Sequence, residues 1–177
     1  MSKLDIISEV LHRRYRPGDQ KRIVEDHAGK GGKKIPDMMR EIVAPPRMPY
    51  LLYRFTTEPE RELFPFFADT SGLKQLCDYV LFALDGKQCY CLLIEMKAGS
   101  GGAKKQLLAA KEFVHFVITS AYRIGKSIQI DEIEIRFISV NEKKKPKPGI
   151  MEQEPEYDAD GWVKLTTQAL RLPQLLK

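Results

Sequence analysis

The chain of 177 residues is 43% hydrophobic and 30% charged, which is sufficient for a single domain with a buried core. Its formal net charge of +5 is compatible with an anionic partner, although many solvated surfaces reach that value. No apolar run approaches the roughly 20 residues that span a bilayer, so a membrane protein is excluded and a cytoplasmic protein is expected.

Residues 1–44 are expected to form a helical extension ahead of the core. Hydrophobic residues at helical spacing predict an amphipathic helix over residues 2–15, and shorter helices are predicted over 19–27 and 35–43. The intervening loop 29–34 is rich in glycine and lysine, but it lacks the Gly-Lys-Ser/Thr ending of a phosphate-binding P-loop. It is either a loop that touches a phosphate backbone or a solvated linker.

The core begins with residues 50–57, whose β-forming side chains predict a strand that pairs beside the strand starting at Cys77. A short aromatic helix or turn over 58–68 and a turn over 69–72 connect the two. Three cysteines, an odd number, lie in predicted strands, which fits a reducing compartment better than a disulfide framework. These are Cys77, Cys89 and Cys91, and we interpret them as buried small hydrophobic residues.

Two apolar runs on either side of Asp85-Gly86 predict a β-hairpin with this dipeptide as its turn. In that register Leu84 lies opposite Lys87. The remaining predicted pairs are Phe82 with Cys89, Val80 with Cys91 and Asp78 with Leu93.

Alternation along the hairpin places Asp78, Glu95 and Lys97 on one face. Asp78 and Glu95 are then diagonal neighbours, with β-carbons within roughly 7–8 Å, which is close enough to share one metal ion. A purely structural alternative is that both acids cap the open end of the hairpin, with Lys97 as an ion-pair partner.

After Lys97, a glycine-rich turn at 99–102 leads into a helix predicted over 103–122, with a hydrophobic stripe along one side. A strand over 130–140 follows, and strand–helix–strand connections of this kind produce a mixed sheet. The loop 143–148 is basic and contains prolines. Residues 162–166 are a candidate edge strand. The leucine-rich tail that follows is expected to pack back on the core. We therefore predict a single α/β domain with a core at about 50–140 and a C-terminal extension over 141–177.

The chain from about 77 to 140 resembles the PD-(D/E)XK nuclease superfamily. The resemblance rests on Asp78, on Ile94-Glu95-Met96-Lys97 at the end of a hydrophobic strand, and on the following helix with Gln106-Leu107 near its start. The proline that often precedes the first acid is replaced by Cys77. The resemblance implies a restriction-endonuclease-like fold, in which helices flank a mixed central β-sheet.

The resemblance also implies a role for each residue of the motif. Asp78 and Glu95 would hold Mg²⁺ or Mn²⁺, with the backbone carbonyl of Met96 as a possible further ligand. Lys97 would position or activate the attacking water, and Gln106 would support the catalytic centre. In the superfamily an acid on the first helix often completes the metal site, and both Glu25 and Glu41 are candidates for it.

These roles predict a metal-dependent nuclease that hydrolyses phosphodiester bonds in DNA, with Lys104 and Lys105 binding the phosphate backbone. One alternative is a non-catalytic module of the same fold, which binds nucleic acid or a protein partner, as a homodimer or as a subunit of a larger complex. A third possibility, a nucleotide-binding regulator that uses the 99–102 loop, has no complete motif behind it. The sequence does not distinguish DNA from RNA as the substrate, or an endonuclease from an exonuclease.

Overall fold

The computed structural model shows a mixed α/β fold with two mixed sheets, and it describes residues 1–25, 38–55, 67–68, 70, 73–97, 102–141 and 154–177. Its five-stranded central sheet has the strand order β3-β4-β5-β6-β7, and a second sheet has the order β1-β2-β8. The central strands are β3 (Tyr50–Arg54), β4 (Tyr79–Asp85), β5 (Gln88–Lys97), β6 (Ile133–Asn141) and β7 (Trp162–Leu165). The second sheet contains β1 (Arg22–Glu25), β2 (Met38–Val43) and β8 (Ala169–Arg171).

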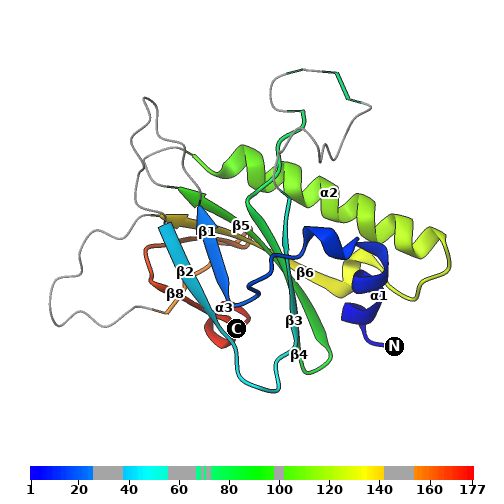
Figure 1. Ribbon diagram of the computed structural model, residues 1–177, viewed down its shortest axis with the longest axis horizontal. Helices are drawn as coiled ribbons and strands as arrows, with labels where there is room; N and C mark the ends of the chain where they lie inside the picture. The colour runs from blue at the N-terminus through cyan, green and yellow to red at the C-terminus, as the bar shows by residue number, and fades with distance from the viewer. Residues whose placement is uncertain (26–37, 56–66, 69, 71–72, 98–101, 142–153) are drawn as a thin grey trace, which may run out of the picture.

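The central sheet combines an antiparallel meander with a parallel half. β3, β4 and β5 pair antiparallel, and α2 (Lys104–Arg123) then carries the chain back so that β6 runs parallel to β5 and β7 parallel to β6. The carboxyl ends of β5, β6 and β7 therefore meet at one edge, and Figure 1 shows α2 starting beside that edge. The predicted meander, crossover helix and following strand are confirmed.

Helices cover one face of the central sheet and the second sheet covers the other (Figure 1). α1 (Lys3–Val10) and α2 pack on the face that contains Val80, Phe82 and Leu93. The opposite face, which includes Leu81 and Leu92, packs against β1, β2, β8 and α3 (Leu172–Leu175). The burial of both faces explains why β4 and β5 are almost continuously apolar in sequence.

The hairpin between β4 and β5 forms as predicted, but its turn is displaced by one residue. Asp85 pairs with Gln88, so the linking residues are Gly86 and Lys87. Gly86 has a φ of +58° at the first linking position, where a type II′ turn requires glycine. The predicted pairing of Leu84 with Lys87 is therefore wrong. Each residue of β4 pairs two residues further along β5 than predicted, so the predicted pairs Phe82–Cys89, Val80–Cys91 and Asp78–Leu93 are wrong as well.

The two short helices predicted in the N-terminal extension are wrong, because the described residues of these regions include the strands β1 and β2 instead. β1 pairs with residues 38–41 of β2, and β8, from near the other end of the chain, pairs with residues 41–43 of β2. Ile23 and Ile42 face the second core, so burial between the two sheets stabilises extended structure over the local helical pattern. The helix predicted over residues 2–15 ends at Val10, and a separate 3-10 turn (η1) spans Arg13–Tyr15.

The later predictions agree more closely with the structure. The strand predicted over 50–57 is β3, the helix over 103–122 is α2, and the strand over 130–140 is β6, preceded by the short 3-10 helix η3 (Ile130–Glu132). β7 is the predicted edge strand, and the leucine-rich tail packs into the second core. The loops 29–34 and 143–148, and most of the connections predicted over 58–68 and 69–72, lie outside the described residues. Within the part of the chain that the structure describes, no helix is long and apolar enough to cross a membrane.

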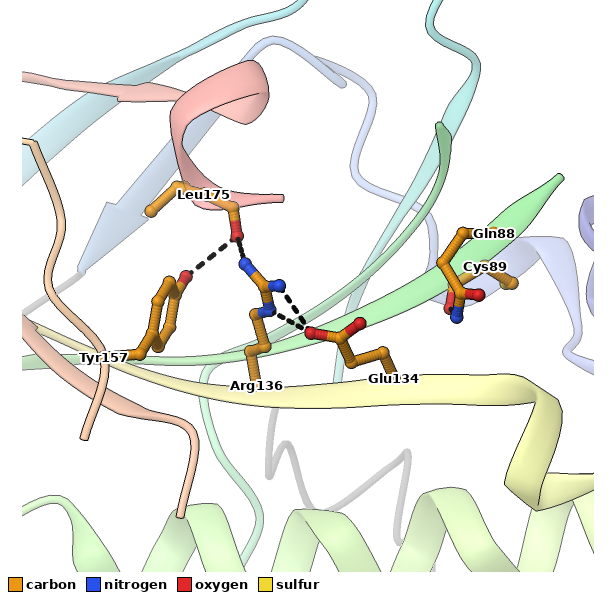
Figure 2. A network of polar contacts seen from close by, with 6 residues as sticks. All are labelled: Gln88, Cys89, Glu134, Arg136, Tyr157 and Leu175. Carbon is orange, nitrogen blue, oxygen red and sulfur yellow. Dashed lines mark hydrogen bonds and ion pairs between the residues drawn. The ribbon is translucent and has the colours of Figure 1, made fainter. Parts of the chain in front are cut away.

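A polar cluster around Arg136 holds the C-terminal segment against β6 (Figure 2). The Arg136 guanidinium donates to the Leu175 carbonyl oxygen at 2.5 Å and pairs with Glu134, and the Tyr157 hydroxyl donates to the same carbonyl at 3.0 Å. The ring of Tyr90 also lies against the guanidinium, 5.0 Å from ring centroid to Cζ. Of these residues, Glu134, Arg136 and Tyr157 line a hollow of about 370 Å³. Because they bond one another, we interpret the cluster as a structural anchor for α3.

Tyr79 forms a hydrogen-bonded link between the two sheets. Tyr79 on β4 is 2% exposed, and its hydroxyl donates to the Val24 carbonyl oxygen at 2.8 Å and accepts from the Val24 amide at 2.9 Å. Both backbone groups of this β1 residue are therefore satisfied by a side chain from the central sheet. Because Tyr79 directly follows Asp78, the same contact also fixes the start of β4 beside the candidate site.

We expect Tyr79→Phe to destabilise the protein by about 1–3 kcal/mol, because it leaves the amide and carbonyl of Val24 without their partner. Urea denaturation followed by circular dichroism measures the loss. Tyr122→Phe is the matched control, since Tyr122 is 56% exposed on α2 and its substitution should leave the free energy of unfolding unchanged. Equal effects of the two substitutions would contradict this role of Tyr79.

Candidate functional site

Asp78, Glu95 and Lys97 come together where β4 begins and β5 ends. Asp78 immediately precedes β4, and extending the pairing of Tyr79 with Ile94 by one residue places Asp78 directly opposite Glu95. The two acids are thus direct neighbours instead of the diagonal neighbours that the sequence predicted. Because side chains alternate along a strand and Leu93 faces the helices, Glu95 and Lys97 lie on the helix-covered face as well.

The side chains of Asp78 and Glu95 each accept a hydrogen bond from a backbone amide on the opposite side of the strand pair. A side-chain oxygen of Glu95 accepts from the Asp78 amide at 3.2 Å, and a side-chain oxygen of Asp78 accepts from the Met96 amide at 2.7 Å. The other Glu95 oxygen lies 2.5 Å from the Lys97 ammonium nitrogen. This reciprocal arrangement fixes both carboxylates at the point where the hairpin ladder ends.

Glu95 is a buried acid, with a side chain only 5% exposed, while Lys97 is 19% exposed. Burial, followed by the negative charge of Asp78, raises the pKa of Glu95 to about 7, against the lowering effect of the Lys97 ammonium. Two carboxylates with insufficient compensating charge are the environment that a bound cation would relieve. The pair is therefore electrostatically strained unless further positive charge or a proton is present.

The donor atoms suit a hard divalent ion. Two carboxylates provide oxygen ligands, and Mg²⁺ is commonly held by one or two carboxylates with waters and substrate phosphate completing its shell. Among the described residues, no third histidine, cysteine or acid joins Asp78 and Glu95. The side chain of Met96 is buried on the opposite face, so only its backbone borders the site.

The remaining predicted residues have different positions. Gln106 is half-buried in the first turn of α2, and Lys105 in the same turn is exposed. The support of the catalytic centre by Gln106 and the binding of phosphate by Lys105 stay predictions. Lys104 extends over the Trp162 ring, with its ammonium nitrogen 5.9 Å from the ring centroid, and therefore reaches β7. Neither candidate for the additional acid lies on a helix, because Glu25 ends β1 and Glu41 lies in β2, where it is exposed and paired with Arg22.

Strand pairing adds residues that local sequence patterns did not identify. Ser139 on β6 aligns with Glu95, and Lys164 on β7 aligns with Ser139. Asn141 aligns with Lys97, and its backbone carbonyl accepts a hydrogen bond from Arg40 on β2 at 3.1 Å. Aligned residues of parallel strands share a face, so Ser139, Asn141 and Lys164 extend the candidate site toward β7. Only the long-range register of the sheet reveals them.

Comparisons of the chain with family models, with curated proteins and with solved structures found no match. The candidate site therefore rests on the chain's own residues and their geometry.

In metal-free buffer, the contribution of Glu95 to folding stability should decrease as the pH rises from about 4.5 to about 7. The pKa of Glu95 is higher in the folded protein than its ordinary value of 4.5, so this contribution is complete below that value and is lost as the pH passes the folded value. At roughly 1.4 kcal/mol per pH unit, the loss amounts to at most about 3 kcal/mol. Urea denaturation at a series of pH values, with a chelator present, measures it.

The substitution Glu95→Gln should remove this pH dependence, because an amide does not ionise. Glu112→Gln, at an exposed position on α2, serves as the matched control and should preserve it. A wild-type protein whose stability does not decrease relative to Glu95→Gln between these pH values would show that the buried acid is not electrostatically strained.

Proposed function

We propose that this protein is a Mg²⁺-dependent nuclease of the PD-(D/E)XK type that hydrolyses phosphodiester bonds in DNA. The observation that supports the proposal most is the reciprocal pairing of Asp78 with the Glu95 strand, with the Lys97 ammonium 2.5 Å from Glu95. Two adjoining acids with a cation beside them provide a place for a metal ion and a group that can stabilise an attacked phosphate.

The architecture supports the same proposal. The hairpin of β4 and β5, followed by the crossover helix α2 and the parallel strand β6, has the same order along the chain as the segments that carry the sequence resemblance. The acids lie at the carboxyl end of β5, and ligands of open α/β sheets bind beyond the carboxyl ends of strands. A restriction-endonuclease-like fold is therefore part of the proposal.

Each residue has a defined task in the proposed reaction. When bound, Mg²⁺ supplies Lewis-acid stabilisation of phosphate charge and a more acidic water. Asp78 and Glu95 hold the ion, with both carboxylates oriented by the backbone amides that they accept from. Lys97 is half-buried on the same face, where its ammonium places a fixed positive charge beside the carboxylates and the attacked phosphate.

The proposal also assigns substrate contacts to residues other than the two acids. Lys104 and Lys105, in the exposed first turn of α2, bind phosphate groups of the strand, and Gln106 beside them supports the catalytic centre. Activity in the cytoplasm, and assembly as a homodimer or within a larger complex, stay predictions.

We expect Glu95→Gln and Lys97→Gln each to reduce Mg²⁺-dependent cleavage of DNA by about 100-fold or more, because each removes a charge from the reacting centre. Linear, circular and branched DNA are incubated with Mg²⁺ or Mn²⁺ and the products separated by electrophoresis. An RNA substrate in the same assay decides between the two nucleic acids.

The matched controls carry the same substitutions at exposed positions away from the site. Glu112→Gln lies on α2 and Lys87→Gln lies in the turn at the opposite end of the hairpin, and both should cleave at the wild-type rate. Cleavage that persists in Glu95→Gln and Lys97→Gln, with folding intact, would refute the assignment.

A second candidate function is a non-catalytic module of the same fold. The observation that favours it is that Asp78, Glu95 and Lys97 already bond to one another or to adjacent backbone, as a purely structural cluster would. Binding of DNA without cleavage, unaffected by Glu95→Gln and Lys97→Gln, would support this function over the nuclease.

A further inference from the structure

We propose that Lys164 on β7 binds the phosphate backbone of the substrate strand beyond the cleavage site, so that the strand crosses the sheet edge from β5 toward β7. This inference rests on the proposed function and assigns a substrate contact to a strand outside the resemblance. It concerns a residue that the catalytic motif does not include.

The pairing of the parallel strands places Lys164 in line with the candidate site. Glu95 aligns with Ser139, and Ser139 aligns with Lys164. The parallel stacking of Trp162 on Phe137, with ring centroids 4.2 Å apart, shows that these aligned side chains project on one face. Phe137 belongs to the core under the helices, so Lys164, two residues after Trp162, lies on the face that carries Glu95.

The spacing of the strands suits a bound polynucleotide. Neighbouring strands lie about 4.8 Å apart, so the backbone of Lys164 is roughly 10 Å from that of Glu95. This corresponds to about three nucleotide steps at 3.4 Å each along a duplex. A strand attacked at the acids would therefore present a phosphate a few nucleotides away to Lys164.

The charged and polar side chains along this path suit a phosphate backbone. Lys164 is exposed and makes no ion pair within the described part of the chain, so its ammonium is available to a phosphate. Lys104 reaches the same strand from α2, because its ammonium lies over the Trp162 ring. Ser139, which is half-buried between the acids and Lys164, adds a hydroxyl donor to the path. Together they form a route of positive charge and hydrogen-bond donors that leads away from the two acids.

The test measures DNA binding by fluorescence anisotropy in a chelator, so that cleavage does not contribute, at several salt concentrations. Lys164→Gln should weaken binding about threefold to tenfold and lower the slope of log affinity against log salt by about 1, the value for one lost phosphate contact. Lys164→Arg should restore both. Lys87→Gln, in the hairpin turn at the far end of β5, is the control and should match the wild type.

Three results would overturn the inference. They are no binding of DNA by the wild type, an unchanged salt slope in Lys164→Gln, or an equal loss in Lys87→Gln. Cleavage assays distinguish failure of this inference from failure of the proposed function. If the wild type does not cleave but Lys164→Gln still loses one contact, the nuclease proposal fails while the binding path stands. If the enzyme cleaves, Lys164→Gln should raise KM by a similar threefold to tenfold and leave kcat within about twofold.

Discussion

The candidate site depends on two acids held at the open end of a hydrophobic hairpin. Burying a carboxylate is costly unless it is hydrogen-bonded and its charge is compensated. Asp78 and Glu95 meet the first condition by accepting backbone amides across the strand pair, and Lys97 meets the second only in part, because the pKa of Glu95 stays raised to about 7. The remaining electrostatic strain is the property that a divalent cation would use.

The surrounding fold keeps these groups in position. The core beneath α1 and α2 packs one face of β4 and β5 up to the acids, and the second sheet packs the other. Tyr79 connects the start of β4 to β1, while Arg136 and Tyr157 secure α3 against β6. Side chains held between packed strands keep their orientation without rearrangement, which the proposed catalysis would require.

The sequence predicted the parts of the fold that depend on local pattern. The hairpin, the crossover helix and the shared face of Asp78 and Glu95 follow from alternation and helical periodicity. The strands β1 and β2 could not be found in this way, because their pairing and burial depend on β8 and the central sheet. The displaced turn at Gly86 and the alignment of Lys164 depend likewise on register, which local composition does not determine.

The most direct measurement is an anomalous difference map from crystals of the protein soaked in Mn²⁺. We expect a peak between the side chains of Asp78 and Glu95, with carboxylate oxygens of both residues among its ligands. A map with no peak at that position, while Glu95 remains paired with Lys97, would contradict the claim that these acids form a metal site.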